Sequence, residues 1–482
     1  ADMDLGELLE VARNEWGDDL PTDGIEAEVT GIAYDSRQVV PGDLFCCLPG
    51  LVEDGHDHAS EAALAGASAL LVERLLDLKV AQVLVPDARR TMALFASVLH
   101  GRPSRRLDVV GVTGTNGKTS VVHMLAEVLR HGGRHVAESG TLTGIRTTPE
   151  APDLQAQLAA WADEGVETVC MEVSSHALSQ HRVDGIGFAA VAHMNLTRDH
   201  LDYHESMEAY ATAKQRLLVR EFTGRGVVVA DDDGGRERAE AARRSGLEVV
   251  EVSTSGAAVT VGSSGSRFEW RGGEVDLPLP GGFAVTNALV VAELAALLGM
   301  SAAEAREALG TLKPVPGRFE HLPEVAGISV VVDYAHTPDA IASALAAARV
   351  VADGRVLCVF GCGGGRDRGK RPEMGRAALL GADVVVVTSD NPRDEPPEGI
   401  IADILSGMDA TSLGDAASER GPTEVIVEPD RRTAIAKAIG LALPGDLVLV
   451  AGKGHESVQE VGALRLPFDD RGVAAELLGM RS

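Results

Sequence analysis

Val109–Ser120, reading VVGVTGTNGKTS, is the stretch that decides the fold of the middle of this chain. A short apolar run rich in β-branched residues leads into it, and apolar residues recur at helical spacing after Lys118. The pattern therefore predicts a strand, a tight loop and a helix. Gly114 and Gly117 let the backbone approach an anion closely, while the helix start offers unpaired N–H groups and the charge of Lys118.

This stretch is suited to hold a polyphosphate, and the Thr119 hydroxyl is placed to coordinate Mg²⁺. The strict eight-residue phosphate-loop pattern is not met, because Val112 stands where its first glycine would fall. We therefore interpret the stretch as a shortened relative of that loop. The alternative is a glycine-rich strand-to-helix turn without a ligand, but such a turn does not require Lys-Thr at the helix start.

The composition is that of a globular protein with several cores. At 482 residues the chain is long enough for about three domains. A formal net charge of −28 argues against binding to nucleic acid or anionic lipid, so anionic ligands need local basic sites. The five cysteines form no CxxC pair, which favours buried free thiols and a reducing compartment. Without a membrane-length apolar run or a signal-peptide pattern, we expect a cytoplasmic protein with no membrane partner.

The first hundred residues predict a small unit of strands and helices. Short strands are expected within Glu28–Phe45 and at Ser68–Val72. His56 and His58 could suggest a metal pair, but without other ligands nearby we interpret them as exposed polar caps at a helix start. The segment Arg102–Arg106, RPSRR, is typical of a linker, and we expect a domain boundary directly after it.

Polar residues follow the predicted strands of the middle region. Thr168–Val173 predicts a strand that ends around Glu172, and Phe188–Met194 predicts a strand that runs into a polar segment at 195–204. Ligands of α/β proteins bind at this edge of the sheet, so Glu172 is placed to hold a metal near the phosphates. The alternative is a glutamate that faces solvent.

Two further features of the middle region lack a local functional signal. Lys214 lies on an amphipathic helix, and this pattern alone predicts a solvated lysine. The segment 254–279 is rich in Ser and Gly and alternates like β-structure, which predicts an insert before an apolar helix that opens at Thr286.

The last third of the chain alternates strands and helices. Strands are expected at Ile328–Asp333, Val356–Phe360, Asp383–Thr388, Glu424–Val427 and Asp446–Ala451. Repeated units of this length indicate a parallel, doubly wound sheet. Polar motifs come at the ends of four of these strands: DYAH, GCGGGR, DNPR and GKGHE. Such sheets bind their ligands at the carboxyl ends of the strands.

Six motifs along the chain carry a family resemblance: GTNGKT, MEVSSHALSQHRV, NLTRDHLDYH, VPGRFE, DYAHTPDA and DNPR. In this order they resemble the Mur ligase family over nearly the full length. The resemblance implies an α/β fold of three domains, with a UDP-substrate-binding domain at 1–106, a central P-loop ATPase domain at 107–314 and an amino-acid-binding domain at 315–482. The last of these is expected to hold a Rossmann-like doubly wound sheet. ATP, Mg²⁺ and an acyl-phosphate intermediate are implied as well.

Within the family, the motifs are most similar to the members that add meso-diaminopimelate to UDP-N-acetylmuramoyl-L-alanyl-D-glutamate during peptidoglycan precursor synthesis. The nearest alternative is the same reaction with L-lysine. A folylpolyglutamate synthetase-like ligase shares the ATP core, but the N-terminal DSR segment and the DNPR loop argue against it. An alternative from another class is a phosphate-loop NTPase switch, which would hydrolyse ATP without an amino acid. We expect a monomer that binds small molecules.

The resemblance also assigns roles to residues that match the family motifs. The catalytic positions are Lys118, Lys214 and His200. The ATP-binding positions are Gly114, Thr115, Asn116, Gly117, Lys118, Thr119, Ser120, Asn287, Arg318, Asp333 and His336. The UDP-substrate positions are Tyr34, Ser36, Thr147, Thr148, Ser174, Gln180 and Arg182. The amino-acid positions are Arg366, Asp390, Asn391, Pro392, Arg393, Gly452 and Glu456. The metal-binding positions are Thr119, Glu172, His200 and Lys214, and Lys214 matches a lysine that is carbamoylated (N6-carboxylysine).

The chemistry of these residue types agrees with the implied reaction. A carboxylate is a poor acyl donor, and its activation by ATP needs charge neutralisation of the kind that Lys118 and Mg²⁺ supply. A cationic Lys214 would repel Mg²⁺, whereas its carbamate is an anionic oxygen ligand. Meso-diaminopimelate differs from lysine by a second carboxylate, and the Arg393 guanidinium, steadied by Asn391, is expected to bind that group in a buried two-bond contact.

Overall fold

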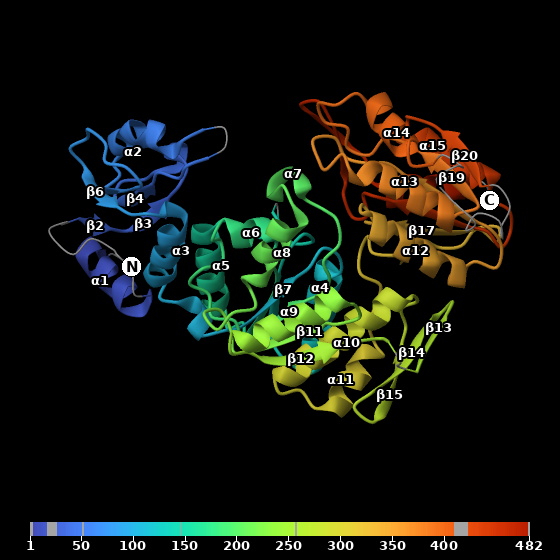
Figure 1. Ribbon diagram of the computed structural model, residues 1–482, viewed down its shortest axis with the longest axis horizontal. Helices are drawn as coiled ribbons and strands as arrows, with labels where there is room; N and C mark the ends of the chain where they lie inside the picture. The colour runs from blue at the N-terminus through green and yellow to red at the C-terminus, as the bar shows by residue number, and fades with distance from the viewer. Residues whose placement is uncertain are drawn as a thin grey trace.

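The computed structural model describes residues 3–16, 27–50, 53–144, 146–255, 258–408 and 423–480. Three α/β sheets follow one another along the chain, and each forms the centre of its own lobe (Figure 1). The N-terminal lobe, blue in the figure, lies at one end of the molecule, and the C-terminal lobe, orange to red, lies beside the central lobe at the other. The expected α/β fold with three domains is confirmed.

The N-terminal lobe is built on a four-stranded parallel sheet in the order β3-β4-β5-β6. Its strands are β3 (Gly31–Ala33), β4 (Asp43–Cys46), β5 (Ala69–Val72) and β6 (Ala81–Leu84), and a short antiparallel pair joins β1 (Met3–Asp4) to β2 (Glu28–Val29). Helices α1 (Leu5–Trp16) and α3 (Ala88–Leu99) pack on one face and α2 (Ala59–Ala65) on the other. Helix α3 and strand β6 were not predicted from the sequence.

His56 corrects the expectation of two exposed caps. The residue is 4% exposed, and its Nε2 accepts a hydrogen bond from the backbone N–H of Glu73 at 3.0 Å. Nδ1 therefore carries the proton, which it donates to Asp54 Oδ1 at 2.6 Å. His58 stays partly exposed beside Glu61, with 3.5 Å between Nδ1 and Oε2. The His56 ring thus links the turn before α2 to the end of β5 through two hydrogen bonds.

The central lobe is built on a six-stranded, wholly parallel sheet in the order β12-β11-β10-β7-β9-β8. Its strands are β7 (Asp108–Thr113), β8 (Val136–Ser139), β9 (Thr168–Glu172), β10 (Ala190–His193), β11 (Arg225–Val229) and β12 (Glu248–Val252). Helices α4 (Lys118–His131), α10 (Gly282–Leu297) and α11 (Ala302–Leu309) pack on one face, and α5 (Ala151–Asp163), α6 (Ser175–Ser179) and α9 (Asp233–Arg244) on the other. Because both faces are covered, the inner strands are continuous apolar runs.

The predicted insert is an antiparallel sheet of β13 (Val259–Gly262), β14 (Gly265–Trp270) and β15 (Gly273–Leu277). Phe268 and Trp270 point from it into the core that contains α10. Helix α10 begins at Gly282, earlier than the expected Thr286. The ring of Phe283 packs against Phe319, with 5.8 Å between centroids, which holds this first turn in the helix.

The C-terminal lobe carries the third sheet, in the order β16-β17-β21-β18-β19-β20. Its strands are β16 (Glu320–His321), β17 (Ser329–Asp333), β18 (Val356–Phe360), β19 (Val384–Val387), β20 (Glu424–Val427) and β21 (Leu447–Ala451). Helices α12 (Pro338–Val351), α13 (Lys370–Gly381) and α14 (Pro397–Leu405) pack on one face, and α15 (Arg431–Leu441) and α16 (Asp470–Gly479) on the other. The doubly wound arrangement is confirmed.

The C-terminal sheet departs from the expected parallel sheet at one edge. Strand β16 pairs antiparallel with β17, so the sheet is mixed. A separate hairpin of β22 (Val458–Val461) and β23 (Leu464–Pro467) follows β21. The five cysteines are free and buried, as predicted. Among the described residues, none of the helices combines the length and the apolar character that a membrane crossing requires.

Candidate active site

The predicted strand, loop and helix at 109–120 are present, since β7 ends at Thr113 and α4 begins at Lys118. Gly114 and Gly117 have φ angles of 146° and 90°, a region that residues with a side chain rarely adopt. A Cβ at position 114 would also lie 2.7 Å from the Cβ of Met194 on the next strand end. These two glycines therefore let the loop turn tightly against the central sheet.

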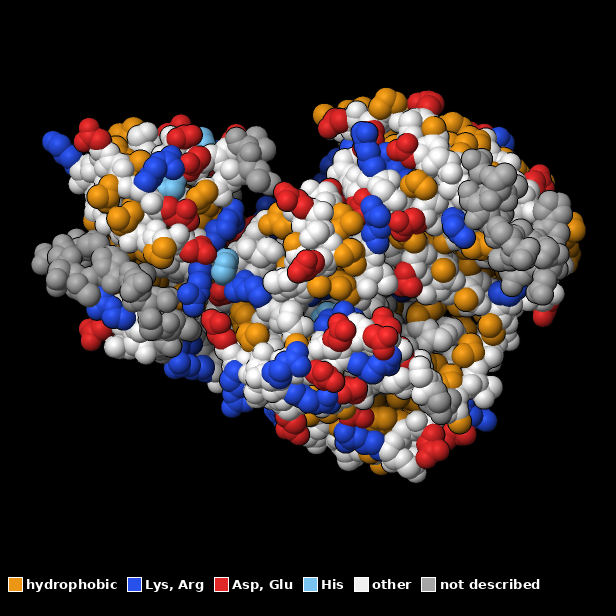
Figure 2. Space-filling view, in the orientation of Figure 1, with side chains coloured by type: hydrophobic (Ala, Val, Ile, Leu, Met, Phe, Trp, Pro, Cys, Tyr) orange, Lys and Arg blue, Asp and Glu red, His pale blue; other side chains and the backbone are white. Residues whose placement is uncertain are grey.

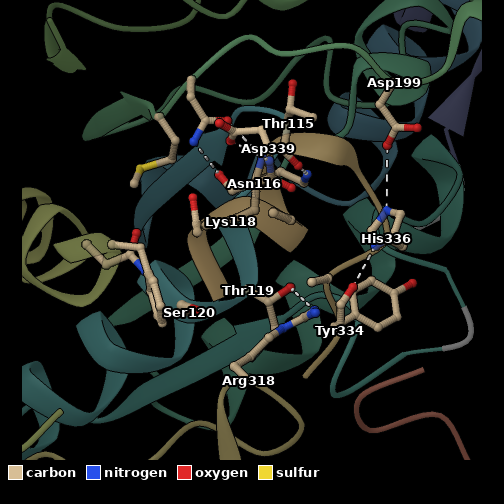
Figure 3. Close-up of a pocket in the computed structure, with 18 of the residues that line it drawn as sticks. Thr115, Asn116, Lys118, Thr119, Ser120, Asp199, Arg318, Tyr334, His336 and Asp339 are labelled. Atoms are coloured by element: carbon tan, nitrogen blue, oxygen red, sulfur yellow. Dashed lines mark hydrogen bonds and ion pairs between the residues drawn. The ribbon is translucent and has the colours of Figure 1, made fainter. Parts of the chain in front are cut away.

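A cavity of about 570 Å³ opens over this loop (Figure 3). Its size is that of a small-molecule site. The cavity is lined by these predicted ATP-binding residues: Thr115, Asn116, Gly117, Lys118, Thr119, Ser120, Asn287, Arg318, Asp333 and His336. Thr147, Glu172, His200 and Arg366 line it too. The structure thus brings residues from the central and C-terminal lobes around one space.

Two lysine amines share one carbonyl oxygen at the phosphate loop. Lys118 Nζ donates to Gly114 O and Thr115 O at 2.9 Å each, and Lys214 Nζ donates to Gly114 O at 2.7 Å. Burial lowers the pKa of Lys118. Burial, with the charge of Lys118 as a further cause, holds the pKa of Lys214 well below its ordinary value.

The solvated lysine that the helix pattern alone predicts at position 214 is wrong. Lys214 is 1% exposed, because helix α8 (Met207–Gln215) turns this residue toward the phosphate loop. Its neighbour on the same helix, Tyr210, lies under the amine, with 4.6 Å between Nζ and the ring centroid. The contact joins residues a hundred positions apart, so no local pattern reports it.

Glu172 lies inside the protein and does not face solvent. It is 2% exposed, and its Oε1 accepts hydrogen bonds from Thr119 Oγ1 at 3.0 Å and from the backbone N–H of Thr141 at 2.8 Å. Gly140 makes room for it, because a Cβ there would lie 2.5 Å from the same oxygen. The carboxylate at the end of β9 is therefore held against the first turn of α4.

Asp199 is a buried carboxylate that sequence reasoning did not single out. Its Oδ1 lies 2.8 Å from Lys370 Nζ at the start of α13, and its Oδ2 lies 3.4 Å from His200 Nε2 and 3.6 Å from His336 Nε2. Burial opposes its charge, but the neighbouring His336 ring and the charge of Lys370 hold its pKa well below the ordinary value. A carboxylate anion thus lies where the central and C-terminal lobes meet. Its position in the polar NLTRDH segment is the sequence feature from which a role in the site could have been predicted.

Further polar contacts hold the C-terminal lobe over the cavity. Asn116 Nδ2 lies 3.3 Å from both Thr337 Oγ1 and Asp339 Oδ2 at the start of α12. Arg318 Nη2 donates to Thr119 Oγ1 at 2.9 Å, as the dashed line in Figure 3 marks. The nucleotide cavity therefore has a floor from one lobe and a roof from the other.

One group of the predicted UDP-substrate residues lies beside the end of β9. Thr148 Oγ1 donates to the Glu172 carbonyl at 2.9 Å and accepts from the Ser174 N–H at 3.2 Å. Arg182 donates to Gln180 Oε1 at 2.6 Å, and a terminal nitrogen lies 2.8 Å from the Glu150 carboxylate. Glu150 thus occupies the guanidinium that an anionic peptide substrate would need. Thr147 is joined to Thr141 by a hydroxyl contact of 3.3 Å.

The other two predicted UDP-substrate residues lie in the N-terminal lobe. Tyr34 reaches the central lobe, where its hydroxyl donates to Asp153 Oδ2 on α5 at 2.5 Å. Ser36 instead binds Glu61 within its own lobe at 3.2 Å. On the face drawn in Figure 2 the surface is hollowed between the N-terminal lobe and the two others. Ser36 therefore makes no direct contact with the predicted UDP-substrate residues beside the end of β9.

The predicted amino-acid residues gather at the ends of β19 and β21. Asn391 is 6% exposed, and its Nδ2 donates to Glu456 Oε2 at 3.0 Å. A residue that was not predicted, Lys453, is fully buried and donates to Asn391 Oδ1 at 3.0 Å and to Glu456 Oε2 at 3.2 Å. Asp390 packs under Gly452, where a Cβ would lie 2.4 Å from its Oδ2. These loops are mutually fixed.

Arg393 is placed differently from the buried two-bond donor that the sequence led us to expect. Its side chain is 30% exposed, with Nε 2.9 Å from Glu460 Oε2 on β22 and Nη1 2.7 Å from the Gly364 carbonyl. The residue before it, Pro392, has its carbonyl against Gly364, where no Cβ would fit. Arg366 is exposed and lines the nucleotide cavity instead. Arg393 is thus partly occupied by the protein's own acceptors.

The oxygen ligands near the phosphate loop suit Mg²⁺, which needs few protein ligands, better than a metal ion that is coordinated by protein side chains alone. Among the described residues, no group of three or more His, Cys, Asp or Glu side chains is arranged to hold a metal. The oxygens of Thr119 and Glu172 are neighbours, and Mg²⁺ commonly takes one or two protein oxygens together with phosphates and water. Burial lowers the pKa of His200 to about 3, so its ring is neutral.

Known protein families match three segments that together make up most of the chain. The family described as "Mur ligase family, catalytic domain" matches residues 28–97, "Mur ligase middle domain" matches 112–295, and "Mur ligase, glutamate ligase domain" matches 317–454. The three matches follow the three sheets in order. The predicted site residues lie within or directly beside these segments.

Individual relatives extend the match over the full length. A UDP-N-acetylmuramoyl-L-alanyl-D-glutamate–2,6-diaminopimelate ligase of Syntrophomonas wolfei is 42% identical, with 94% of this chain and 95% of the relative covered. The solved structure of another UDP-N-acetylmuramoyl-L-alanyl-D-glutamate–2,6-diaminopimelate ligase has a TM-score of 0.67 at 31% identity, covering 97% of this chain and 98% of the other. The MurF ligase of Thermotoga maritima in complex with ADP shares the fold, with a TM-score of 0.63 at 20% identity and 94% and 98% coverage.

Proposed function

Since this chain belongs to the Mur ligase family, we propose that it is the ATP-dependent ligase that joins 2,6-diaminopimelate to UDP-N-acetylmuramoyl-L-alanyl-D-glutamate in peptidoglycan synthesis. The observation that carries this proposal is that side-chain contacts through Arg318, Tyr334 and Glu456 join the phosphate loop to the DNPR loop of a third domain. A phosphate-loop switch would not need that third domain. The 42% identity to a 2,6-diaminopimelate ligase over 94% of this chain argues against the folylpolyglutamate synthetase-like alternative.

We assign one substrate to each domain. Residues 1–106 bind the UDP end of the acceptor, residues 107–314 bind ATP, and residues 315–482 bind the amino acid. The contact of Tyr34 with α5 and the contacts of Arg318 and Asn116 across the cavity support this division, because each domain reaches the central one through a predicted site residue. The sites all belong to one chain, so we infer that a monomer suffices, working in the cytosol where ATP is supplied.

The reaction has two steps that balance in atoms and charge. The terminal carboxylate of the glutamyl residue attacks the γ-phosphorus of ATP, and ADP leaves, giving an acyl phosphate. The free amine of diaminopimelate then attacks the acyl carbon, phosphate leaves and a proton is lost from nitrogen, giving the amide. Lys118 and the N–H groups at the start of α4 stabilise the charge of the transferred phosphoryl group. Arg182 binds the anionic acceptor when the acceptor carboxylate displaces Glu150 from its guanidinium. Mg²⁺, when bound, neutralises phosphate charge beside Thr119 and Glu172.

Lys214 has the properties of an amine that forms a carbamate. Burial lowers the pKa of Lys214, which raises the share of its amine that is neutral, and the neutral nitrogen attacks CO₂ to form an N-carboxylate and release a proton. An ionised Lys214 would be repelled by Lys118 at the Gly114 carbonyl, whereas the carbamate is attracted to Lys118. It also supplies an anionic oxygen for Mg²⁺. His200, neutral and beside Asp199, is a second candidate ligand.

One assay tests the proposed function. ADP release from ATP is followed with UDP-N-acetylmuramoyl-L-alanyl-D-glutamate present and with meso-diaminopimelate, L-lysine or no amino acid added. We expect turnover that depends on both the acceptor and meso-diaminopimelate. ATP hydrolysis that is unchanged by omission of the amino acid would instead identify a nucleotide switch.

The choice of amino acid is expected to depend on Arg393. Its Nη2 has no hydrogen-bond partner among the described residues, so it remains available to the second carboxylate of meso-diaminopimelate, which lysine lacks. Arg393→Ala should lower kcat/KM for meso-diaminopimelate by about a hundredfold, the effect of losing a charged hydrogen-bonded pair of on the order of 3 kcal/mol. The rate with L-lysine should change little.

A neighbouring arginine gives the matched control for this variant. Arg465 is 72% exposed and lies 3.9 Å from Glu460, the carboxylate that Arg393 binds. Arg465→Ala should leave kcat/KM for both amino acids unchanged. Equal kcat/KM of the unmodified enzyme for lysine and meso-diaminopimelate would show that this loop does not select the amino acid.

A further inference from the structure

Tyr334 lies between the nucleotide cavity and the predicted amino-acid residues, and neither the sequence motifs nor the reaction proposed above gives it a role. It follows β17 in the C-terminal lobe. Its hydroxyl donates to Glu456 Oε1 at 3.4 Å. Its ring carries the guanidinium of Arg318, with 4.1 Å between Cζ and the ring centroid. One side chain thus touches a predicted amino-acid residue at one end and a predicted ATP residue on its face.

The contacts continue from Arg318 to the phosphate loop. Arg318 Nη2 donates to Thr119 Oγ1 at 2.9 Å, and Thr119 Oγ1 in turn donates to Glu172 Oε1 at 3.0 Å. Figure 3 shows Thr119, Arg318 and Tyr334 in this sequence along the lower wall of the cavity. An unbroken series of contacts therefore joins Glu456 to the residues that face the phosphates.

The amino-acid end of this series is rigid. Glu456 Oε2 is held by Asn391 Nδ2 at 3.0 Å and by the buried ammonium of Lys453 at 3.2 Å, which leaves Oε1 for Tyr334 and a ligand. Burial and the charge of Glu456 raise the pKa of Tyr334, so its hydroxyl stays protonated and donates. Any cationic amino group that pairs with Glu456 must share this oxygen with Tyr334.

Two glycines fix the backbone on both sides of Tyr334. A Cβ at Gly454 would lie 2.8 Å from the Tyr334 Cβ, and Gly454 has a φ of 54°. A Cβ at Gly317, next to Arg318, would lie 2.1 Å from the backbone nitrogen of His455. The segment that carries Arg318 and the loop that carries Glu456 are therefore packed backbone to backbone. Gly454 also lies against the Cα and Cβ of Tyr334, so the three segments are packed together.

We propose, on the basis of the function proposed above, that Tyr334 is a positioning residue that couples occupancy of the amino-acid site to the placement of Arg318 at the phosphate loop. The hydroxyl is hydrogen-bonded to Glu456, so its position changes when a ligand binds that carboxylate. The ring face holds the Arg318 guanidinium by a cation–π contact. The coupling is reciprocal, so bound diaminopimelate tightens nucleotide binding by the factor by which nucleotide tightens diaminopimelate binding. The amine is thereby in place when the acyl phosphate forms.

Two substitutions separate the two contacts of Tyr334. Tyr334→Phe removes the hydroxyl and keeps the ring, whereas Tyr334→Leu removes the platform under Arg318. In the full-length enzyme with the UDP-linked acceptor, we measure the Kd of a non-hydrolysable ATP analogue with and without meso-diaminopimelate, and the KM of each substrate. The unmodified enzyme should bind the analogue about tenfold more tightly with the amino acid present, a typical coupling factor.

The two variants should then diverge. Tyr334→Phe should raise the KM for meso-diaminopimelate about tenfold, the effect of one hydrogen bond to a charged carboxylate, without changing the Kd of the analogue measured alone. Tyr334→Leu should bind the analogue equally with and without amino acid. A purely structural role would lower the melting temperature and kcat of Tyr334→Leu but would leave the coupling factor unchanged, and that result would overturn the proposal.

The same experiment separates failure of this proposal from failure of the proposed function. If ADP release by the unmodified enzyme does not depend on meso-diaminopimelate, the proposed function is wrong and the coupling falls with it. If release does depend on it but Tyr334→Leu retains the coupling factor, only the role of Tyr334 is wrong.

Discussion

Replacing Lys118 by alanine is expected to reduce ligation by on the order of a thousandfold or more while the protein stays folded. The amine lies at the floor of the nucleotide cavity and binds the carbonyl oxygens of its own loop, Gly114 and Thr115. When the phosphates of ATP occupy the cavity, this charge faces the group that is transferred. Steady-state ADP release with all substrates present measures the loss.

Stability should not follow activity in this variant. Burial lowers the pKa of Lys118, which means that its charge is costly where it lies, and the side chain fills no core volume. The free energy of unfolding of Lys118→Ala should therefore stay within about 1 kcal/mol of the unmodified value in urea titration. Lys313→Ala, at an exposed position, is the control and should retain full turnover. Unreduced turnover in Lys118→Ala would rule out the phosphate-loop assignment.

Replacing Lys214 by alanine is expected to lower turnover by about a hundredfold or more, because it removes the carbamate oxygen from the predicted Mg²⁺ environment. A short carboxylate such as acetate or formate should restore part of the activity of Lys214→Ala, since it can occupy the space left by the side chain. The exposed residue Glu208 on the same helix provides the control, and Glu208→Gln should neither lose activity nor respond to added carboxylate.

A direct measurement of the modification complements the kinetics. In bicarbonate labelled with carbon-13, the unmodified enzyme should show a carbamate carbon signal in its NMR spectrum that Lys214→Ala lacks. Acidification should remove it, because protonation of the neutral amine withdraws the nucleophile that reacts with CO₂. Full activity of Lys214→Ala in buffer free of small carboxylates would contradict a role for the carbamate.

The parts of the fold that the sequence predicted are those with a strong local period. The strand, loop and helix around Lys118 and the alternating units of the last third carry apolar runs, glycines and capping residues at short range, and their elements lie where expected within a few residues. The antiparallel strand β16 has only two residues, too few to show a period. Helix α10 begins before Thr286 because Phe283 is held by a contact with Phe319 in another lobe.

Site residues could be predicted where a sequence motif contains them. They could not be predicted where a contact between distant parts of the chain places them in the site. Residues of the phosphate loop gather in one cavity as expected. The burial of Lys214 depends on a carbonyl a hundred residues away, and the position of Asp199 depends on Lys370 in a different lobe. Lys453 follows a glycine in a loop like many solvated lysines, and only the folded chain shows that it is surrounded by acceptors.

The roof over the nucleotide cavity also governs how the products depart. Contacts such as Asn116 with Thr337 and Asp199 with Lys370 join the C-terminal lobe to the central lobe beside the cavity, so they hold the two lobes together around a bound nucleotide. We expect ADP to leave more readily when the C-terminal lobe lifts and these contacts break. The rate of lobe opening would then limit the turnover rate. Stronger contacts between the lobes would protect the acyl phosphate better and would also slow product release.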